Sequence, residues 1–228
     1  MAGAQPIART LRILSYLLSY PGTAWRANLR DLRHAIEDDR VLAKRRRLEL
    51  LRLVDGIAAA DPIEAEAAYL EVFDRGRATS LHLFEHVHGD SRDRGPALTD
   101  LGQTYAQAGL DLAAGELPDY LPAVLEFAST QPPREARALL GEMAHILNAL
   151  MTALTKRRSG YARVIGALLE IAGEKAVAVE LPPEEPLDAT WAEPPVFAGC
   201  SSPGQSRPDA PQPVQFVRNA SRAQGATA

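Results

Sequence analysis

PREARALLGEMAHILNALMTALTKR, residues 133–157, carries apolar side chains at the spacing of an α-helix. Its apolar positions are separated by three or four residues, so they share one face of a helix. The basic run from Lys156 to Arg158 suits the end of a helix, because cations stabilise the negative end of the helix dipole. We predict one long helix over 133–157 with six buried residues: Leu139, Met143, Ile146, Leu147, Leu150 and Leu154.

Helical periodicity extends on both sides of this stretch, from about residue 7 to residue 172. Turn residues such as Pro21-Gly22 and Gly109 separate the periodic segments. No segment alternates apolar and polar residues with a period of two, so the sequence predicts no β-sheet. We expect an all-α protein, a single helical domain of about eight to ten helices. The predicted helices cover 7–18, 25–36, 41–58, 62–75, 98–108, 121–128 and 161–171, and another begins near residue 80.

The segment after Asp61 shows a helix start and a predicted buried face. Asp61 suits the N-cap, Pro62 suits the first helical position, and Glu64 completes a capping box. Apolar residues then recur at helical spacing, and we expect them to face the core. They are Ile63, Ala67, Leu70 and Phe73.

Composition excludes several classes of protein. The net charge of −4 at pH 7 gives no general attraction to nucleic acid or to an anionic lipid surface. Cys200 is the only cysteine, so the chain has neither an internal disulfide nor a Cys-x-x-Cys metal site. No long apolar run follows a basic stretch at the N-terminus, and the longest apolar runs fall short of the roughly 18 residues of a membrane span. We expect a cytoplasmic protein that does not insert into a membrane.

The composition changes sharply near residue 181. Nine of the 17 prolines lie between Pro182 and Pro213, and residues 182–228 contain only four Leu, Ile or Val residues. Such a segment buries too little apolar surface to offset the entropy that it would lose on ordering. We therefore predict a helical domain over 1–180 and a Pro-rich, mobile tail over 181–228. The residues of the tail that could dock on the domain are Trp191, Val196 and Phe197.

LHLFEHVHG, residues 81–89, contains the His-x-x-Glu-His spacing of inverted zinc peptidases in His82, Glu85 and His86. On a helix, His82 and His86 would share a face, as two zinc ligands require. A catalytic zinc also needs a third protein ligand and an open position for water. Peptidases of this kind have mixed α/β folds, whereas no sheet is predicted here. A zinc hydrolase is therefore the alternative to a helix whose histidines line a polar face or groove.

Residues 74–94 contain many charged and histidine side chains, and two interpretations stay open. In the structural interpretation, ion pairs and helix caps fix a loop within the domain. In the functional one, the side chains form a polar rim beside an apolar groove that takes an amphipathic helix. The residues are Asp74, Arg75, Arg77, His82, Glu85, His86, His88, Asp90, Arg92, Asp93 and Arg94.

YLEVFDRGRATSLHLFEHVHGDSRDRG, residues 69–95, closely resembles the signature of the nitrate reductase molybdenum cofactor assembly chaperones. These are the NarJ type within the broader TorD/DmsD group of redox-enzyme maturation chaperones. ELPDYLPAVLEF at 116–127 resembles the second motif of that family, and LSYLLSYPG at 14–22 resembles its opening helix. TWAEPPVF at 190–197 is a weaker match. The resemblance covers roughly residues 7–197, and its first motif is long and specific.

The resemblance implies an all-α fold, no catalysis, and no bound metal or cofactor. Proteins of this family bind the N-terminal segment of the catalytic subunit of nitrate reductase in the cytoplasm. They hold this apoenzyme until its molybdenum cofactor is inserted, and they delay its docking on the membrane subunit. The expected partner is that apo catalytic subunit, and proteins that deliver the molybdenum cofactor are further candidates. The zinc hydrolase and a helical adaptor for an unrelated partner stay as the other hypotheses.

The resemblance also implies a set of candidate peptide-binding residues. Tyr120 departs from the family pattern, since many relatives have histidine there. This puts in doubt any role that needs a titratable imidazole, although an aromatic surface would survive. Histidines at the site would make binding sensitive to pH, because imidazole changes its charge near neutral pH. The candidates are Tyr69, Phe73, Asp74, Arg75, His82, His86, His88, Asp90, Arg92, Glu116, Pro118, Asp119 and Tyr120.

Overall fold

The all-α prediction is confirmed. The computed structural model describes residues 4–89 and 91–181, and within them the chain forms eleven α-helices, one 3₁₀ turn and no strand. The first five helices are α1 (Ala4–Leu18), α2 (Thr23–Ala27), α3 (Leu29–Glu37), α4 (Lys44–Ala59) and α5 (Pro62–Phe73). The 3₁₀ turn η1 (Arg77–Thr79) and α6 (Leu83–Val87) follow. The remaining helices are α7 (Arg94–Gln107), α8 (Leu121–Thr130), α9 (Pro133–Glu142), α10 (Ala144–Lys156) and α11 (Ala162–Ala172).

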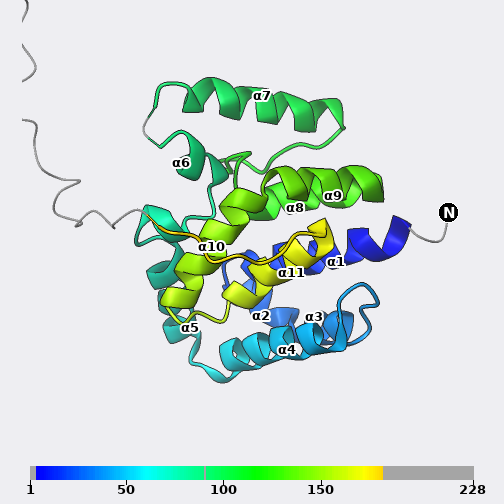
Figure 1. Cartoon of the computed structure of the whole chain (residues 1–228). Helices are drawn as coiled ribbons and strands as arrows, with labels where there is room; N and C mark the ends of the chain where they lie inside the picture. Colours follow the sequence, from blue (N-terminus) through cyan, green and yellow to red (C-terminus); the bar gives the residue numbers. More distant parts are fainter. Residues whose placement is uncertain (1–3, 90, 182–228) are drawn as a thin grey trace, which may run out of the picture. The chain divides into compact units, whose positions relative to one another are not determined.

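Four helices form the centre of the core (Figure 1). α1 packs along α8, and α10 packs along α11, which also contacts α1, α4 and α9. Every residue of α11 from Val164 to Leu169 is buried, so the middle of this helix lies inside the molecule. The predicted apolar faces of α1, α8 and α11 are confirmed. Their buried residues include Ile7, Leu11, Leu14, Leu18, Leu121, Val124, Leu125, Ala128, Tyr161, Val164, Ile165, Leu168 and Ile171.

The prediction of a single long helix over 133–157 is wrong, because this stretch forms two helices. α9 ends at Glu142, α10 begins at Ala144, and the two are bent by 63°. Gly141 at the end of α9 has low helix propensity, which lowers the cost of a bend there. Periodicity could not show the break, because five of the six predicted side chains are buried and only Leu139 is half-buried. Only together do α9 and α10 have the length and composition of a membrane span, and no single helix in the described chain does.

The helix predicted over 25–36 is also divided. α2 ends at Ala27, and α3 begins at Leu29. Asn28 lies between them, and its side-chain amide donates to the Tyr16 hydroxyl at 3.0 Å and to the Ala24 carbonyl at 3.1 Å. Asparagine side chains compete in this way with the backbone hydrogen bonds of a helix, which explains the break.

Aspartate side chains fix the backbone at the start of α5 and in the turn before α4. Asp61 caps α5 as predicted, because its Oδ1 accepts the N–H groups two and three residues ahead, at 2.9 and 3.4 Å. Asp39 Oδ1 accepts the N–H of Val41 at 2.9 Å and the N–H of Leu42 at 2.8 Å. This turn occupies the residues before Lys44, so α4 begins at Lys44 rather than at residue 41.

α5 turns a different face to the core than the sequence predicts. Of the expected inward residues, Phe73 is buried, but Ile63 is 78% exposed and Leu70 is 44% exposed. Tyr69 is buried in their place, because two aromatic rings on one face bury more apolar area than the aliphatic face would. The outward residues Ile63, Ala67 and Leu70 follow one another at i, i+4 and i+7. We call these three residues the α5 stripe.

α6 and α7 differ most from the sequence prediction. α6 has five residues, and His82 precedes it in extended backbone. α7 buries only Tyr105, while Leu98 and Leu101 are half-buried and Ala108 is exposed. The predicted end of this helix at Gly109 is correct, because Gly109 has a positive φ of 74° that suits glycine after a helix.

Beyond α11, residues 174–181 cross α10 without helical structure, and we call this segment the strap. The N–H of Val177 donates to Asn148 Oδ1 at 2.7 Å, and the N–H of Val179 donates to Thr152 Oγ1 at 3.2 Å. Residues 182–228 lie outside the described residues. The domain boundary near residue 181 and the mobile tail therefore stay predictions.

Candidate functional site

Many of the predicted site residues lie together at one end of α5. A pocket of about 370 Å³ opens there between α5, η1, the start of α6 and Tyr120, and we call it the α5–α6 pocket. Five predicted residues line it: Tyr69, Phe73, Asp74, His82 and Tyr120. The other lining residues are Leu70, Gly76, Arg77, Ser80, Leu81, Glu85 and Arg94.

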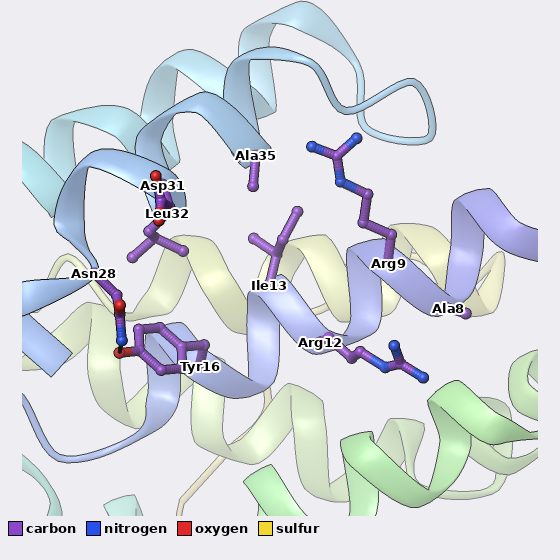
Figure 2. Close-up of a pocket in the computed structure, with 9 residues that line it drawn as sticks. All are labelled: Ala8, Arg9, Arg12, Ile13, Tyr16, Asn28, Asp31, Leu32 and Ala35. Atoms are coloured by element: carbon purple, nitrogen blue, oxygen red, sulfur yellow. Dashed lines mark hydrogen bonds between the residues drawn. The ribbon is translucent and has the colours of Figure 1, made fainter. Parts of the chain in front are cut away.

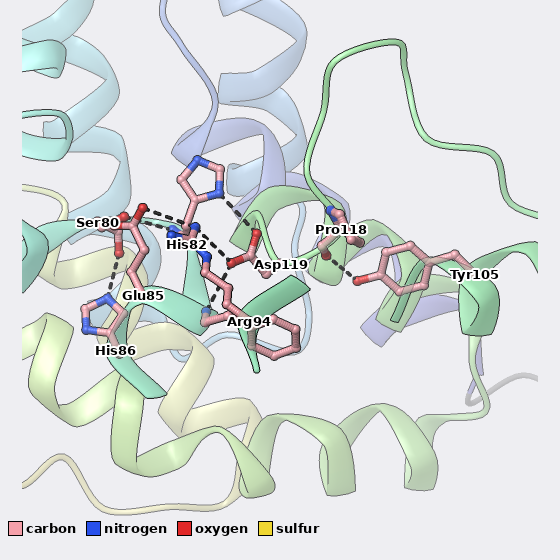
Figure 3. Close-up of polar contacts among 9 residues, drawn as sticks. Ser80, His82, Glu85, His86, Arg94, Tyr105, Pro118 and Asp119 are labelled. Carbon is pink, nitrogen blue, oxygen red and sulfur yellow. Dashed lines mark hydrogen bonds and ion pairs between the residues drawn. The ribbon is translucent and has the colours of Figure 1, made fainter. Parts of the chain in front are cut away.

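Asp119 holds the start of α6 (Figure 3). Its side chain is 0% exposed, its Oδ1 lies 3.2 Å from His82 Nδ1, and its Oδ2 accepts the Phe84 N–H at 3.1 Å. Its backbone carbonyl accepts the Leu83 N–H at 3.0 Å. Arg94 Nη2 lies 3.8 Å from Oδ2, which places a cation beside the buried carboxylate. Asp119 therefore accepts N–H groups of the first turn of α6, as a capping side chain does, although it is 35 residues away from Phe84 in the chain.

Backbone pairing also joins the segments that contain His82 and Asp119, which are distant in the sequence. His82 and Tyr120 form an isolated antiparallel bridge, and the Leu121 N–H donates to the Leu81 carbonyl at 2.8 Å. This pairing holds His82 in extended backbone, so α6 begins only at Leu83. The predicted helix start near residue 80 is wrong, because tertiary pairing overrides local helix propensity.

His86 is half-buried, and its Nε2–H donates to the carbonyl oxygen of Ser80 at 2.8 Å (Figure 3). Burial lowers the pKa of His86 below its ordinary value of 6.5. The hydrogen bond to Ser80 and the nearby carboxylate of Glu85 act in the opposite direction but are smaller effects. His86 is therefore uncharged at neutral pH in the folded protein.

The free energy of unfolding is expected to fall as the pH is lowered through about 6.5. Below that pH, His86 takes up a proton in the unfolded chain but resists it in the folded one, because its folded pKa is lower. Thermal melts between about pH 7.5 and about pH 5 should therefore show a smaller fall for His86→Gln, whose amide can still donate to Ser80. The same slope in both proteins would contradict the assignment to His86.

The geometric premise of the zinc hypothesis is wrong. His82 precedes α6, so His82 and His86 do not share the face of a helix. Nδ1 of His82 faces Asp119, while Nε2 of His86 faces a backbone carbonyl. Within residues 4–89 and 91–181, no group of three or more His, Cys, Asp or Glu side chains is placed to hold a metal ion.

Arg94, the first residue of α7, connects this helix to α6 and to Asp119. Its Nη2 lies 3.2 Å from Glu85 Oε1, and its Nε is buried without a hydrogen-bond partner. These contacts favour the structural interpretation for Arg94, Glu85 and Asp119, since the Arg94 guanidinium bridges the two carboxylates. Arg94 and Glu85 also line the α5–α6 pocket, so its polar wall is held in a fixed position.

The floor of the pocket is aromatic core. The Tyr69 hydroxyl donates to a backbone carbonyl of α1 at 2.7 Å and lies 3.2 Å from the Tyr120 hydroxyl. The Phe73 ring centroid lies 4.7 Å from that of Tyr69 and 4.9 Å from that of Tyr161. Burial raises the pKa of Tyr69, so its hydroxyl stays protonated. Tyr120 is half-buried and its ring lies 5.4 Å from that of His82, which keeps an aromatic surface at this position.

Other predicted residues lie outside the pocket lining. Arg75 is exposed and its guanidinium lies 2.9 Å from the carboxylate of Glu71. Pro118 is buried, and its carbonyl accepts the Tyr105 hydroxyl at 2.8 Å (Figure 3). Asp90 is not among the described residues. The predicted residues that do not line the pocket are Arg75, His86, His88, Arg92, Glu116, Pro118 and Asp119.

The sequence profile of the nitrate reductase delta subunit family matches residues 24–165. This range covers more than half of the chain and includes every residue that lines the α5–α6 pocket. The chain belongs to this family.

Sequence identity to individual proteins supports membership of the nitrate reductase delta subunit family. The nitrate reductase molybdenum cofactor assembly chaperone NarJ of Escherichia coli K12 is 42% identical over 193 residues, which are 80% of this chain and 82% of NarJ. The probable chaperone NarW of the same strain is 37% identical over 194 residues, 80% of each chain. The probable chaperone NarJ of Bacillus subtilis is 34% identical over 160 residues, 70% of this chain and 86% of that protein. The resemblance found in the sequence is confirmed, and so is the expectation from it that the protein is not an enzyme.

Sequence reasoning missed part of the pocket wall of this delta subunit family member. Leu70 was expected in the core, and Gly76, Ser80 and Leu81 were not predicted as site residues. All four lie within the 69–95 motif. The continuous motif, rather than its polar residues alone, was the available signal.

A second hollow lies between α1 and α3 (Figure 2). Its volume is about 700 Å³, and no predicted site residue lines it. Its lining residues are Ala8, Arg9, Arg12, Ile13, Tyr16, Asn28, Asp31, Leu32 and Ala35. We call it the α1–α3 groove, and it is the second surface on which an apolar helix could bind.

Proposed function

We propose that the chain is a chaperone dedicated to a respiratory nitrate reductase. It binds the N-terminal segment of the apo catalytic subunit in the cytoplasm and keeps that subunit competent for insertion of the molybdenum cofactor. It also delays docking of this subunit on the membrane subunit, and proteins that deliver the cofactor are further partners. The observation that carries the proposal is the 42% identity over 82% of the length of E. coli NarJ, which is named as an assembly chaperone of nitrate reductase.

The α5 stripe supports a peptide ligand of amphipathic helical character. Ile63 and Leu70 are large apolar side chains at an exposed helix surface, with Ala67 between them. An amphipathic helix binds such a surface through apolar side chains that follow its own i, i+3, i+4 and i+7 positions. Leu70 also lines the α5–α6 pocket, so the apolar stripe and the polar pocket are continuous.

The polar groups of the α5–α6 pocket orient the bound segment. Asp74 and Arg77 are exposed lining residues next to Leu70 and the end of α5. Exposed charges at the rim of an interface set orientation and selectivity more than affinity. The apolar contacts of the α5 stripe therefore supply most of the binding free energy in this proposal.

Leu70→Gln is expected to weaken binding of a synthetic peptide of the reductase N-terminus about tenfold, because burying the exposed Leu70 side chain under the peptide contributes on the order of 1.5 kcal/mol. Titration calorimetry with the full chain measures this change. Ala35→Gln in the α1–α3 groove is the matched control, because it introduces the same side chain on a helix that lines the other hollow. It should leave Kd unchanged. Both variants should melt close to the unsubstituted protein, since Leu70 is exposed and Ala35 is half-buried.

Loss of affinity in Ala35→Gln alone would instead place the ligand in the α1–α3 groove. Equal affinity of the unsubstituted chain for N-terminal peptides of unrelated enzymes would favour the general adaptor over a dedicated chaperone. Stoichiometric zinc that is lost in His86→Ala would restore the hydrolase alternative.

A further inference from the structure

The exposed face of α5 is bordered by carboxylates on both sides. Glu66 lies one helical turn from the first and from the last residue of the α5 stripe, and it borders one side of the stripe. Glu64 lies three residues before Ala67 and Glu71 lies four residues after it, so both border the opposite side. Glu64 and Glu71 are exposed, and Glu66 is half-buried. The α5 stripe is therefore an apolar surface between two acidic edges.

The first two turns of α5 have no cation in their own part of the chain. No Lys, Arg or His occurs between Arg52 and Arg75. Arg26 lies beside the end of α4, but its Nη2 donates to two backbone carbonyls there, at 3.1 and 3.4 Å. Within the described residues, the Glu64 carboxylate has no hydrogen bond or ion pair, and the Glu66 carboxylate accepts a tyrosine hydroxyl at 2.8 Å. The described part of the chain therefore leaves both negative charges without a paired cation.

The pocket end of α5 differs from its first turns, because cations lie beside the carboxylates there. Arg75 pairs with a glutamate in the last turn of α5 at 2.9 Å, and Arg94 pairs with Glu85 at 3.2 Å. Arg157 donates to backbone carbonyls at and just after the end of α5, and Arg77 lines the α5–α6 pocket. The net negative charge of this surface is therefore greatest over the first two turns of α5.

We propose that the first two turns of α5 select cations in the bound peptide. The apolar side chains of the ligand helix pack on the α5 stripe, and Lys or Arg side chains at the border of its apolar face reach Glu64 and Glu66. Long cationic side chains suit this position, because their alkyl stems cover apolar surface while their charged ends reach the acidic edges. The contacts also fix the direction of the ligand, since its cation-rich end lies over the first turns of α5 and its other end at the α5–α6 pocket. The inference deepens the proposed function, because it names the chemistry that the same surface recognises.

Two designed helical peptides of equal length test this selection without the reductase. Both carry leucine at i, i+4, i+7 and i+11, and the positions that border the leucines in one half are lysine in the first peptide and glutamate in the second. Titration calorimetry with the full chain at low ionic strength should show about tenfold tighter binding of the lysine peptide, because two exposed attractions replace two repulsions. Added salt should reduce the difference, because it screens exposed charges. Equal binding of the two peptides at low salt would overturn the inference.

Charge reversal on α5 assigns the selection to its residues. The double variant Glu64→Lys with Glu66→Lys should prefer the glutamate peptide, and the milder Glu64→Gln with Glu66→Gln should bind both peptides alike. Glu135→Lys with Glu142→Lys is the matched control, because it changes the net charge equally at exposed positions of α9. The control should keep the preference for lysine. If it lost that preference as the α5 variants do, the selection would come from overall charge and the inference would fail.

The reductase peptide separates this inference from the proposed function. Glu64→Lys with Glu66→Lys should bind the reductase peptide about tenfold more weakly than the unsubstituted chain, whereas the α9 control should bind it equally well. Unchanged affinity in the α5 variant would overturn cation selection and leave the proposed function standing. A chain that selects the lysine peptide through α5 but does not bind the reductase peptide would refute the proposed function and leave the selection standing.

Discussion

Asp119→Ala is expected to lower the free energy of unfolding by about 3–5 kcal/mol, the range typical of breaking a buried charge pair. The carboxylate is fully buried, and its removal leaves the Phe84 N–H and the His82 ring without their acceptor. It also removes the buried negative charge that lies beside the Arg94 guanidinium. Asp119→Asn keeps one acceptor oxygen but loses the charge, so a cost of about 2 kcal/mol is expected.

Urea unfolding followed by circular dichroism measures both values. Asp74→Ala is the matched control, because Asp74 lines the same pocket but is exposed, and it should change stability by less than about 0.5 kcal/mol. Normal stability of Asp119→Ala, together with loss of peptide binding, would contradict the brace and make Asp119 a direct ligand of the peptide.

The position of Asp119 also explains how the two sequence motifs act together. The first motif supplies residues 81–84, and the second supplies Asp119 and Leu121. The backbone bonds from Leu83 and Leu121 and the side chain of Asp119 join these segments into one wall of the α5–α6 pocket. Residues shared with a chaperone signature can thus shape a binding surface without touching the ligand.

Much of the fold follows from local residue patterns. The Asp61 cap and the apolar faces of α1, α8 and α11 were predictable, because capping and a broad buried face depend on neighbouring residues. The break between α9 and α10 was not predictable, since apolar spacing continues across Met143. Two helices that pack on the same core need the same pattern as one long helix.

The sequence predicted which region of the chain forms the site, but not how the side chains of that region are arranged. The 69–95 motif contains most of the residues that line the α5–α6 pocket. The sequence could not show that His82 pairs with Tyr120, because that contact depends on tertiary structure. It also assigned Leu70 to the core, because a stripe of apolar residues at helical spacing is normally buried. The error bears on the proposed function, since that proposal uses the exposed stripe as the surface that binds a second helix.

Phe73→Ala is expected to lower the free energy of unfolding by about 3–5 kcal/mol, as for other buried phenylalanines. Its ring packs against Tyr69 and Tyr161, so truncation opens a cavity under the pocket. Phe73→Leu fills most of that space and should cost about 1–1.5 kcal/mol. Thermal and urea unfolding of the two variants measures this difference.

The comparison with Leu70 separates the two faces of α5. Leu70 and Phe73 are three residues apart, yet Leu70 is 44% exposed and Phe73 is buried. Leu70→Gln should therefore change peptide affinity and leave stability nearly unchanged. Phe73→Leu should do the reverse, with the remaining folded protein binding the peptide almost normally, because the buried Phe73 ring lies on the floor of the pocket rather than at its mouth. If Phe73→Leu instead lost affinity as strongly as Leu70→Gln while melting normally, a side chain of the peptide would have to contact the aromatic floor of the α5–α6 pocket.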